Sequence, residues 1–322
     1  MRRFEALHLY YAVIIKYTCA SKMRSHWIKY VRLGLHTSIA GSLERSAHSA
    51  AELGANTFQI FSSSPRQWKA SVPTPVAIGL LQRAREKHDL IPLVIHDNYL
   101  INLASAHETV RVKSIEAFRG ELIRAIAIGA EYVVAHPGNY KGQTLEQGLL
   151  NFLEGVAAAA TGLQFGNLML LIENTVGAGA QIGGRLEELH VLREYAATMT
   201  DLPVGFCLDT CHLLASGHDV STSEGVDKTV KEADRILGLD NVRIIHANDS
   251  KGALGSHMDR HANIGEGYIG LNGFRRLLTH PRLRSKAFIL ETPVDKDGDD
   301  RRNLDTLKSL CRTSRTTTTK SS

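Results

Sequence analysis

The stretch "SHMDRHANIGEGYIG", residues 256–270, concentrates side chains that could do chemistry. His257, Asp259 and His261 fall within five positions, and glycines follow at 265, 267 and 270. Imidazole and carboxylate groups at this density do not suit a core, whereas they are common ligands of Zn²⁺. The glycines would let the backbone turn tightly behind them. Three ligand-type residues are weak evidence by themselves, so other parts of the chain must supply partners.

Further ligand-type residues stand at the ends of short apolar segments that are typical of β-strands. Eight such segments recur, with helical stretches between them: "VRLGLH" (31–36), "TFQIF" (57–61), "IPLVIH" (91–96), "YVVAH" (132–136), "LMLLIE" (168–173), "GFCLD" (205–209), "VRIIH" (242–246) and "AFILE" (287–291). Most are nearly continuous apolar runs, as expected for parallel strands that are covered on both faces. Seven of them end on a ligand-type residue: His36, His96, His136, Glu173, Asp209, His246 or Glu291.

This alternation of strands and helices predicts an α/β fold, a single (β/α)₈ TIM barrel over residues 31–310. The intervening stretches, such as "SLERSAHSAAELG", have helical periodicity and often close on glycine. A doubly wound open sheet is the alternative, but no glycine-rich phosphate fingerprint follows the first strand. Residues 1–30 are expected to be a disordered or over-extended tail, and the low-complexity residues 311–322 a disordered tail.

In such a barrel the carboxyl ends of all strands form one rim, and this rim carries the active site. The seven ligand-type side chains would therefore meet although they are far apart in the sequence. One buried histidine is more often a hydrogen-bonded core residue than a ligand, but seven equivalent positions indicate a polynuclear metal site. His212, three residues after Asp209, would face the same centre. Asp259 and His261 would lie on one side of an extended segment across the barrel mouth.

The net charge of +5 arises at the ends of the chain. Residues 1–30 carry a net +5 and residues 311–322 a net +3, which leaves −3 for the segment between them. The basic isoelectric point is therefore no sign of general nucleic-acid binding, and a polyanionic partner needs a local site. No apolar run reaches the roughly 18 residues of a membrane span, and the cysteines show no C-x-x-C spacing. We expect a reduced, cytoplasmic protein that binds no membrane, with a targeting role for the N-terminal tail as the alternative.

From about residue 31 to 300 the sequence resembles the endonuclease IV family, the zinc-dependent apurinic/apyrimidinic endonucleases of base excision repair. The resemblance rests on "HDNYLINLAS", "VAHPGNYKG", "LLIENTVGAG", "GFCLDTCHLLASGHD", "IHANDSKGALGSHMDRHANIGEG" and "FILETP", in the order of the family. The tails lie outside the family pattern, and Asn98 stands where relatives often carry another small residue.

The resemblance implies a trinuclear zinc cluster with nine protein ligands. One zinc would be held by His96, His136 and Glu173, the second by Glu173, Asp209, His246 and Glu291, and the third by His212, Asp259 and His261. Glu173 and Glu291 would be the catalytic residues, and His36 would lie near the site without being a ligand. DNA contacts would come from Arg66 and Gln67 in "SSSPRQW" and from Tyr99 and Leu100. The implied partner is duplex DNA with abasic sites or blocked 3′ ends. We expect the protein to be a monomer.

The residue chemistry is consistent with that expectation. Histidine with carboxylate favours Zn²⁺, with Mn²⁺ as an option at one site, over Mg²⁺. Four carboxylates and three Zn²⁺ ions would leave a net charge of about +2, which attracts a phosphodiester. The expected reaction is hydrolysis 5′ to an abasic site, giving a 3′-hydroxyl and a 5′-deoxyribose phosphate. The alternatives are a sugar isomerase-type barrel, which has no use for the trio His212, Asp259 and His261, and a non-enzymatic binder of damaged DNA.

Overall fold

The computed structural model describes residues 31–64 and 66–311. The predictions made for residues 1–30, including a targeting role, and for residues 312–322 lie outside the described residues. Between these ends, strands and helices alternate along the chain. In the described ranges, none of the helices combines the length and the apolar character needed to cross a membrane.

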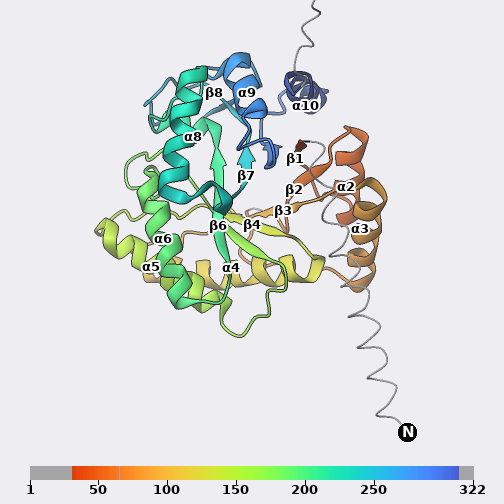
Figure 1. Ribbon diagram of the computed structural model, residues 1–322. Helices are drawn as coiled ribbons and strands as arrows, with labels where there is room; N and C mark the ends of the chain where they lie inside the picture. The colour runs from red at the N-terminus through yellow and green to blue at the C-terminus, as the bar shows by residue number, and fades with distance from the viewer. Residues whose placement is uncertain (1–30, 65, 312–322) are drawn as a thin grey trace, which may run out of the picture. The chain divides into compact units, whose positions relative to one another are not determined.

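Eight parallel strands close into a barrel that helices surround (Figure 1). The strands are β1 (Arg32–His36), β2 (Thr57–Phe61), β3 (Leu93–His96), β4 (Tyr132–Ala135), β5 (Met169–Glu173), β6 (Val204–Asp209), β7 (Val242–His246) and β10 (Ala287–Leu290). Their spatial order is β1-β10-β7-β6-β5-β4-β3-β2, and β1 also pairs with β2, so the barrel has no free edge. The predicted TIM barrel is confirmed, and the alternative of an open sheet is wrong.

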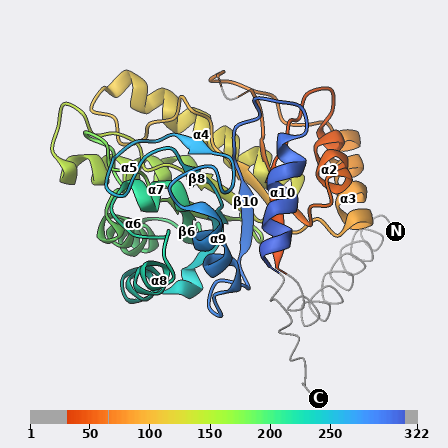
Figure 2. The same cartoon turned by 90° about the horizontal axis from the view of Figure 1, so that it is seen from above.

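The helices follow the strands in the order expected for repeated βα units. They are α2 (Leu43–Glu52), α3 (Pro75–His88), α4 (Glu108–Ile128), α5 (Leu145–Ala160), α6 (Leu186–Met199), α7 (Thr210–Ala215), α8 (Ser223–Leu237), α9 (Gly270–Thr279) and α10 (Asp299–Leu310), with a 3₁₀ turn η2 (Leu239–Asn241). Figure 2 shows α10 between α9 and α2. There the Lys308 ammonium donates a hydrogen bond to the Leu53 carbonyl at the end of α2, at 3.0 Å.

The barrel interior is a layer of buried apolar side chains, one or two from each of six strands. Its members are Val94, Val134, Leu171, Cys207, Ile244, Ala287 and Ile289. Side chains along a strand alternate between its two faces, so a residue two positions further points the same way. Two positions after Leu171 stands Glu173, and two after Ile244 stands His246. The ligand-type residues therefore form the next layer of the same interior, at the rim of the barrel.

A short antiparallel ribbon lies outside the barrel order. It pairs β8 (Asp249–Ser250) with β9 (His261–Ala262), and Ser250 faces His261 in the register. Strands of two residues have no periodicity that a sequence could reveal. The ribbon fixes the start and the end of the loop 251–260, which contains Asp259.

Candidate metal centre

Six of the nine predicted ligands line one cavity. This cavity has a volume of about 410 Å³, and its walls include His96, His136, His212, Asp259, His261 and Glu291. Glu173, Asp209 and His246 lie beneath it with no exposed surface. Residues that are far apart in sequence thus share one pocket at the barrel mouth.

The nine predicted ligands fall into three groups whose ligand-type atoms lie within 4.8 Å of one another. The groups are His96 with His136 and Glu173; Glu173 with Asp209, His246 and Glu291; and His212 with Asp259 and His261. These are the same three sets that the resemblance implied. The geometry brings the side chains together, and their assignment as metal ligands stays a prediction.

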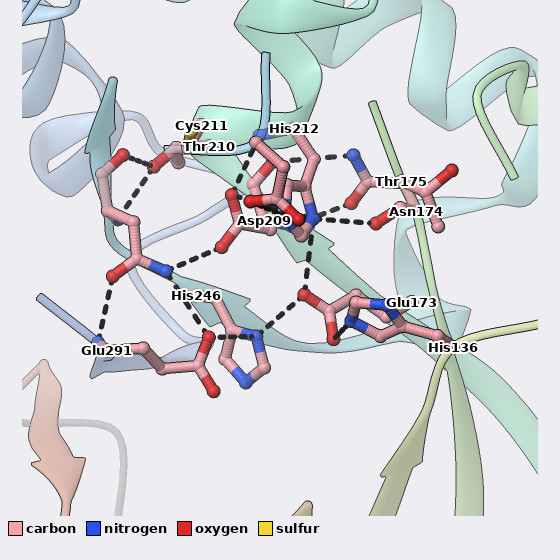
Figure 3. Close-up of polar contacts among 12 residues, drawn as sticks. His136, Glu173, Asn174, Thr175, Asp209, Thr210, Cys211, His212, His246 and Glu291 are labelled. Atoms are coloured by element: carbon pink, nitrogen blue, oxygen red, sulfur yellow. Dashed lines mark hydrogen bonds and ion pairs between the residues drawn. The ribbon is translucent and has the colours of Figure 1, made fainter. Parts of the chain in front are cut away.

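Glu173 lies at the centre of the site, with one carboxylate oxygen toward each of two groups (Figure 3). Its Oε2 is 3.0 Å from His136 Nε2 and 3.2 Å from His96 Nε2. Its Oε1 is 2.9 Å from His246 Nδ1, which is also 3.2 Å from Glu291 Oε2. A carboxylate in this position can be shared by two neighbouring cations.

Backbone carbonyls set which ring nitrogen of three histidines is free. The Nδ1 atoms of His96, His212 and His261 lie 3.0, 2.9 and 3.1 Å from the carbonyl oxygens of Asp97, Asn174 and Glu291. A carbonyl only accepts hydrogen bonds, so each Nδ1 carries a proton, and Nε2 is the nitrogen whose lone pair a metal ion would use when the ring is neutral. The same arrangement is the usual support of metal-bound histidine.

The Nε2 atom of His261 supplies a direct test of whether a cation fits. It is buried and has no hydrogen-bond partner, although it lies 3.7 Å from Asp209 Oδ2 and 3.8 Å from Asp259 Oδ1. A buried polar atom without a partner is costly and needs an explanation. A cation between this nitrogen and the two carboxylates would satisfy it.

His246 is held in the opposite tautomer by Gln59. The Gln59 Nε2 donates to Glu291 Oε1 at 2.6 Å, which sets the orientation of the amide. Its Oε1 therefore faces His246 Nε2, at 2.9 Å, and accepts the ring proton. The Nδ1 of His246 faces Glu173 and Glu291, and in the neutral ring this nitrogen would be free to bind a cation shared with these carboxylates.

The histidines change the acidity of the buried carboxylates. Burial by itself would raise the pKa of Glu173, but His246 and His136 hold that pKa well below its ordinary value. Burial likewise opposes the ionised form of Glu291, yet His246 and His96 lower its pKa to about 2. A hydrogen bond with His212 lowers the pKa of Asp259 to about 2. These carboxylates are therefore ionised at neutral pH.

The carboxylates in turn keep protons on three imidazoles. Burial lowers the pKa of His96, but the hydrogen bond to Glu173 and the charge of Glu291 raise it to about 10. Against the same effect of burial, Asp209 and Asp259 raise the pKa of His212 well above its usual value, and Glu291 and Glu173 raise that of His246. Without metal ions, the protons on these three histidines thus balance the negative charge of the buried carboxylates.

His36 behaves differently from the grouped histidines. Burial lowers its pKa to about 4, although Glu291 opposes this shift. Its ring packs against Phe61 with centroids 4.4 Å apart, and its Nδ1 lies 3.1 Å from Gln59 Nε2. A neutral ring with an amide partner is consistent with the prediction that His36 is near the site but outside the ligand set.

Two thiols also lie beside the ligand groups. Cys207 is close to Glu173 and His246, and Cys211 is close to Asp209 and His261. Burial raises the pKa of Cys207 well above its ordinary value and that of Cys211 to about 11. Both therefore stay protonated near neutral pH and pack as small apolar groups.

Asp249 holds the glycine-rich turn that follows His261. Its buried carboxylate accepts hydrogen bonds from the backbone N–H groups of Gly265 at 2.9 Å, Gly267 at 3.1 Å and Ile269 at 2.9 Å. A Cβ on Gly267 would lie 2.4 Å from the Ser250 carbonyl oxygen, so the close approach requires glycine. The turn thereby anchors β9 and the ligand-type His261.

Sequence reasoning missed Gln59, Asn248 and Asp249. The side-chain amide of Asn248 makes two contacts. Its Nδ2 donates to Asp209 Oδ2 at 2.5 Å, and its Oδ1 accepts from the Glu291 N–H at 2.8 Å. A signal for Gln59 was present, because a lone amide inside the apolar run "TFQIF" needs a buried partner. Asn248 and Asp249 stand two and three residues after His246, immediately before and at the start of the two-residue strand β8, which no periodicity predicts.

Comparisons with known proteins agree with the site. Residues 47–312 match the family model described as a xylose isomerase-like TIM barrel. The chain is 60% identical over 280 residues to a probable endonuclease 4 of Solibacter usitatus, covering 87% of this chain and 97% of that protein. It also superposes on the crystal structure of endonuclease IV from Thermus thermophilus with a TM-score of 0.76 and 37% identity, over 87% and 98% of the two chains.

The chain belongs to the endonuclease IV family. It is accordingly a hydrolase of the nuclease class. A D-tagatose 3-epimerase-like protein superposes with a TM-score of 0.64 at 20% identity, over 86% of this chain and 96% of that one. A likeness at that identity shows the shared barrel alone, so the sugar-isomerase alternative gains no support from it.

The residues that the family resemblance implies as DNA contacts lie on the same rim. Arg66 and Gln67 are exposed, Tyr99 is 70% exposed, and Leu100 is half-buried. Tyr99 packs its ring against Phe61 at 5.1 Å, beside the cavity. Their position fits contact with a large ligand, and their role in binding DNA stays a prediction.

We expect His261→Ala to remove one metal ion per chain. The substitution deletes the unpartnered Nε2 and leaves His212 and Asp259 as an incomplete group. Elemental analysis should give about three metal ions for the unaltered protein and about two for the purified variant. His257→Ala is the matched control, because this histidine is in the same loop but donates to the Val176 carbonyl at 2.6 Å. Unchanged stoichiometry in His261→Ala would contradict the assignment.

We expect zinc binding at pH 7 to release protons. His96, His212 and His246 have raised pKa values and hold protons in the metal-free protein, whereas imidazole must be neutral to bind a metal. Metal affinity should therefore fall as the pH falls. Calorimetric titration of Zn²⁺ into the metal-free protein, in buffers of different ionisation enthalpy, measures the release. An apparent enthalpy that does not depend on the buffer would show that no proton leaves.

Proposed function

We propose that this chain is a DNA-repair endonuclease that hydrolyses the phosphodiester 5′ to abasic sites in duplex DNA. The products would be a 3′-hydroxyl and a 5′-deoxyribose phosphate. The observation that carries the proposal is the position of Glu173, whose two carboxylate oxygens face two different ligand groups in a chain of the endonuclease IV family. Such sharing is typical of multi-metal phosphodiester hydrolysis.

The nine grouped side chains would hold three zinc ions, with Mn²⁺ as an option at one of them. The fit rests on the donor chemistry, in which imidazole nitrogens and ionised carboxylates converge and the two neighbouring thiols stay protonated. The unpartnered Nε2 of His261 supports it independently. When bound, the zinc ions would supply Lewis acidity and positive charge next to the scissile phosphate.

The protein's own contribution is orientation. Asn248 contacts both Asp209 and Glu291, and Gln59 contacts both Glu291 and His246, so these ligand-type groups are fixed relative to one another. Glu173 and Glu291 are the proposed catalytic residues, because each would contact the cations that bind the phosphate. A site that is already ordered has no reorganisation cost during the reaction.

Selection of abasic sites would follow from the depth of the pocket. Glu173, Asp209 and His246 are fully buried, so a regular duplex cannot bring its backbone to them without a nucleotide leaving the stack. An abasic nucleotide has lost its pairing and much of its stacking, which lowers the usual cost of a few kcal/mol for flipping. Arg66, Gln67, Tyr99 and Leu100 would occupy the gap, and blocked 3′ ends could enter the same pocket. One chain contains all nine proposed ligands, so we propose that it acts as a monomer.

A duplex that carries one abasic analogue tests the proposal. The purified protein should cut just 5′ to the analogue, and the cut should be lost after chelation and restored by Zn²⁺. An identical duplex without the analogue is the control for specificity. Binding without a cut would favour a damage-binding protein, and cleavage that survives complete metal removal would refute the zinc-dependent mechanism.

We expect Glu173→Gln to lower the rate of incision at least about 10²-fold, because it removes the charge shared by two metal groups. The side chain keeps its size, so the barrel should remain folded. Incision rate and metal content are measured on the same preparation. Glu131→Gln, in a half-buried pair with Arg85 at 2.7 Å, is a control for loss of a carboxylate elsewhere. A Glu173→Gln protein that cuts at the unaltered rate would show that the assignment is wrong.

A further inference from the structure

The loop after β2 carries Arg66 and Gln67 and is fastened at its base by a buried ion pair. The Glu121 and Arg124 side chains, one turn apart in α4, form a 2.8 Å pair and are 2% and 4% exposed. Burying such a pair is costly unless its remaining hydrogen bonds are satisfied. Glu121 and Arg124 make these remaining hydrogen bonds with residues of the loop.

The contacts of the pair are with both ends of the loop. Ser62 donates a hydrogen bond to Glu121 and its hydroxyl oxygen accepts one from Arg124 Nε at 2.7 Å. The Nη1 of Arg124 donates to the Ala70 carbonyl oxygen at 3.4 Å. One guanidinium group thus joins Ser62 at the beginning of the loop to Ala70 at its end.

A second fastening connects this loop to the one that follows β3. Asn98 is 3% exposed, and its Nδ2 donates to the Gln67 carbonyl oxygen at 2.5 Å. Its Oδ1 accepts from the Leu100 N–H at 2.8 Å. A single amide therefore couples the backbone of Gln67 to that of Leu100, next to the exposed Tyr99. The exposed side chains of both loops stand on a shared, hydrogen-bonded support.

We propose that Asn98 and the Glu121–Arg124 pair are positioning residues that hold the described parts of the two loops, residues 62–64 and 66–70 of the first and 97–100 of the second, in one preformed arrangement for insertion into damaged DNA. The inference rests on the proposed function and deepens it, because it assigns the position of the proposed DNA-contact residues to three residues outside the nine proposed ligands. Exposed loops that are ordered only on binding add their ordering cost to every association. Loops that hydrogen bonds already hold in place before binding add no such ordering cost.

Asn98→Ser separates this role from a general structural one. Serine can still accept the Leu100 N–H, because its hydroxyl favours the same local turn, but it is too short to reach the Gln67 carbonyl. We expect KM for the abasic duplex to rise about three- to tenfold, the cost of ordering one or two side chains on binding. We expect kcat and metal content to remain within about twofold, since this amide meets none of the proposed ligands.

Hydrogen exchange of the DNA-free protein gives a readout that does not depend on incision. The region around Gln67 should exchange faster in Asn98→Ser than in the unaltered protein, while the barrel strands stay protected. Asn241→Ser is the matched control, because Asn241 also donates an amide hydrogen bond to a carbonyl, that of Leu237 at 2.7 Å, but at the amino end of β7. It should change neither the exchange of the rim loops nor KM.

Ser62→Ala is the second variant. It tests the same inference if Asn98→Ser alters the metal content through the nearby His96. It removes the hydroxyl that joins the loop to the ion pair and should raise KM and loop exchange in the same direction. Unchanged exchange in both variants would overturn the inference, as would faster exchange with unchanged KM. If the unaltered protein fails to cut the abasic duplex, the proposed function fails, and the exchange data still show whether the fastening exists.

Discussion

The concentration of carboxylate at the buried base of one pocket constrains everything else at this site. Glu173 and Asp209 have no exposed surface, and Glu291 lies against the same imidazole as Glu173. Negative charges buried this close together repel, and burial deprives them of solvation. Cations must therefore be present, either as protons on histidine or as metal ions. The raised pKa of His96 and the lowered pKa of Glu291 are two expressions of that requirement.

The barrel provides the geometry that makes such a concentration possible. Its core residues and its ligand-type residues stand two positions apart on the same strands, as with Leu171 and Glu173 or Ile244 and His246. The apolar layer seals the interior below the carboxylates and keeps water from reaching them from that side. Polar groups above the layer are confined to partners that the barrel itself supplies, chiefly backbone carbonyls and the amides of Gln59 and Asn248. The apolar residues that stabilise the barrel and the proposed ligands therefore occupy adjacent layers of the barrel interior.

The rim differs from the centre in what holds it. Charge compensation fixes the ligand groups, whereas the loop with Arg66 and Gln67 depends on hydrogen bonds from Asn98 and Arg124. In the centre, hydrogen bonds from Gln59 and Asn248 add to this charge compensation. The loop is ordered by the chain itself, before a partner arrives. This division suits the proposed function, in which the rim would recognise a distorted duplex and the pocket would act on one phosphate.

Much of this was determined by the sequence alone. Apolar runs ending on His96, Glu173 or His246 specified both the strands and the side of the barrel where their last residues meet, because parallel strands have one common carboxyl end. The three ligand sets came from family resemblance and match the groups in space. Only the tertiary structure could decide the tautomers, the shared position of Glu173 and the supports from Gln59, Asn98 and Arg124. These features depend on contacts between residues that are distant in the chain. Neither composition nor periodicity reveals which of these residues come within hydrogen-bond distance of one another.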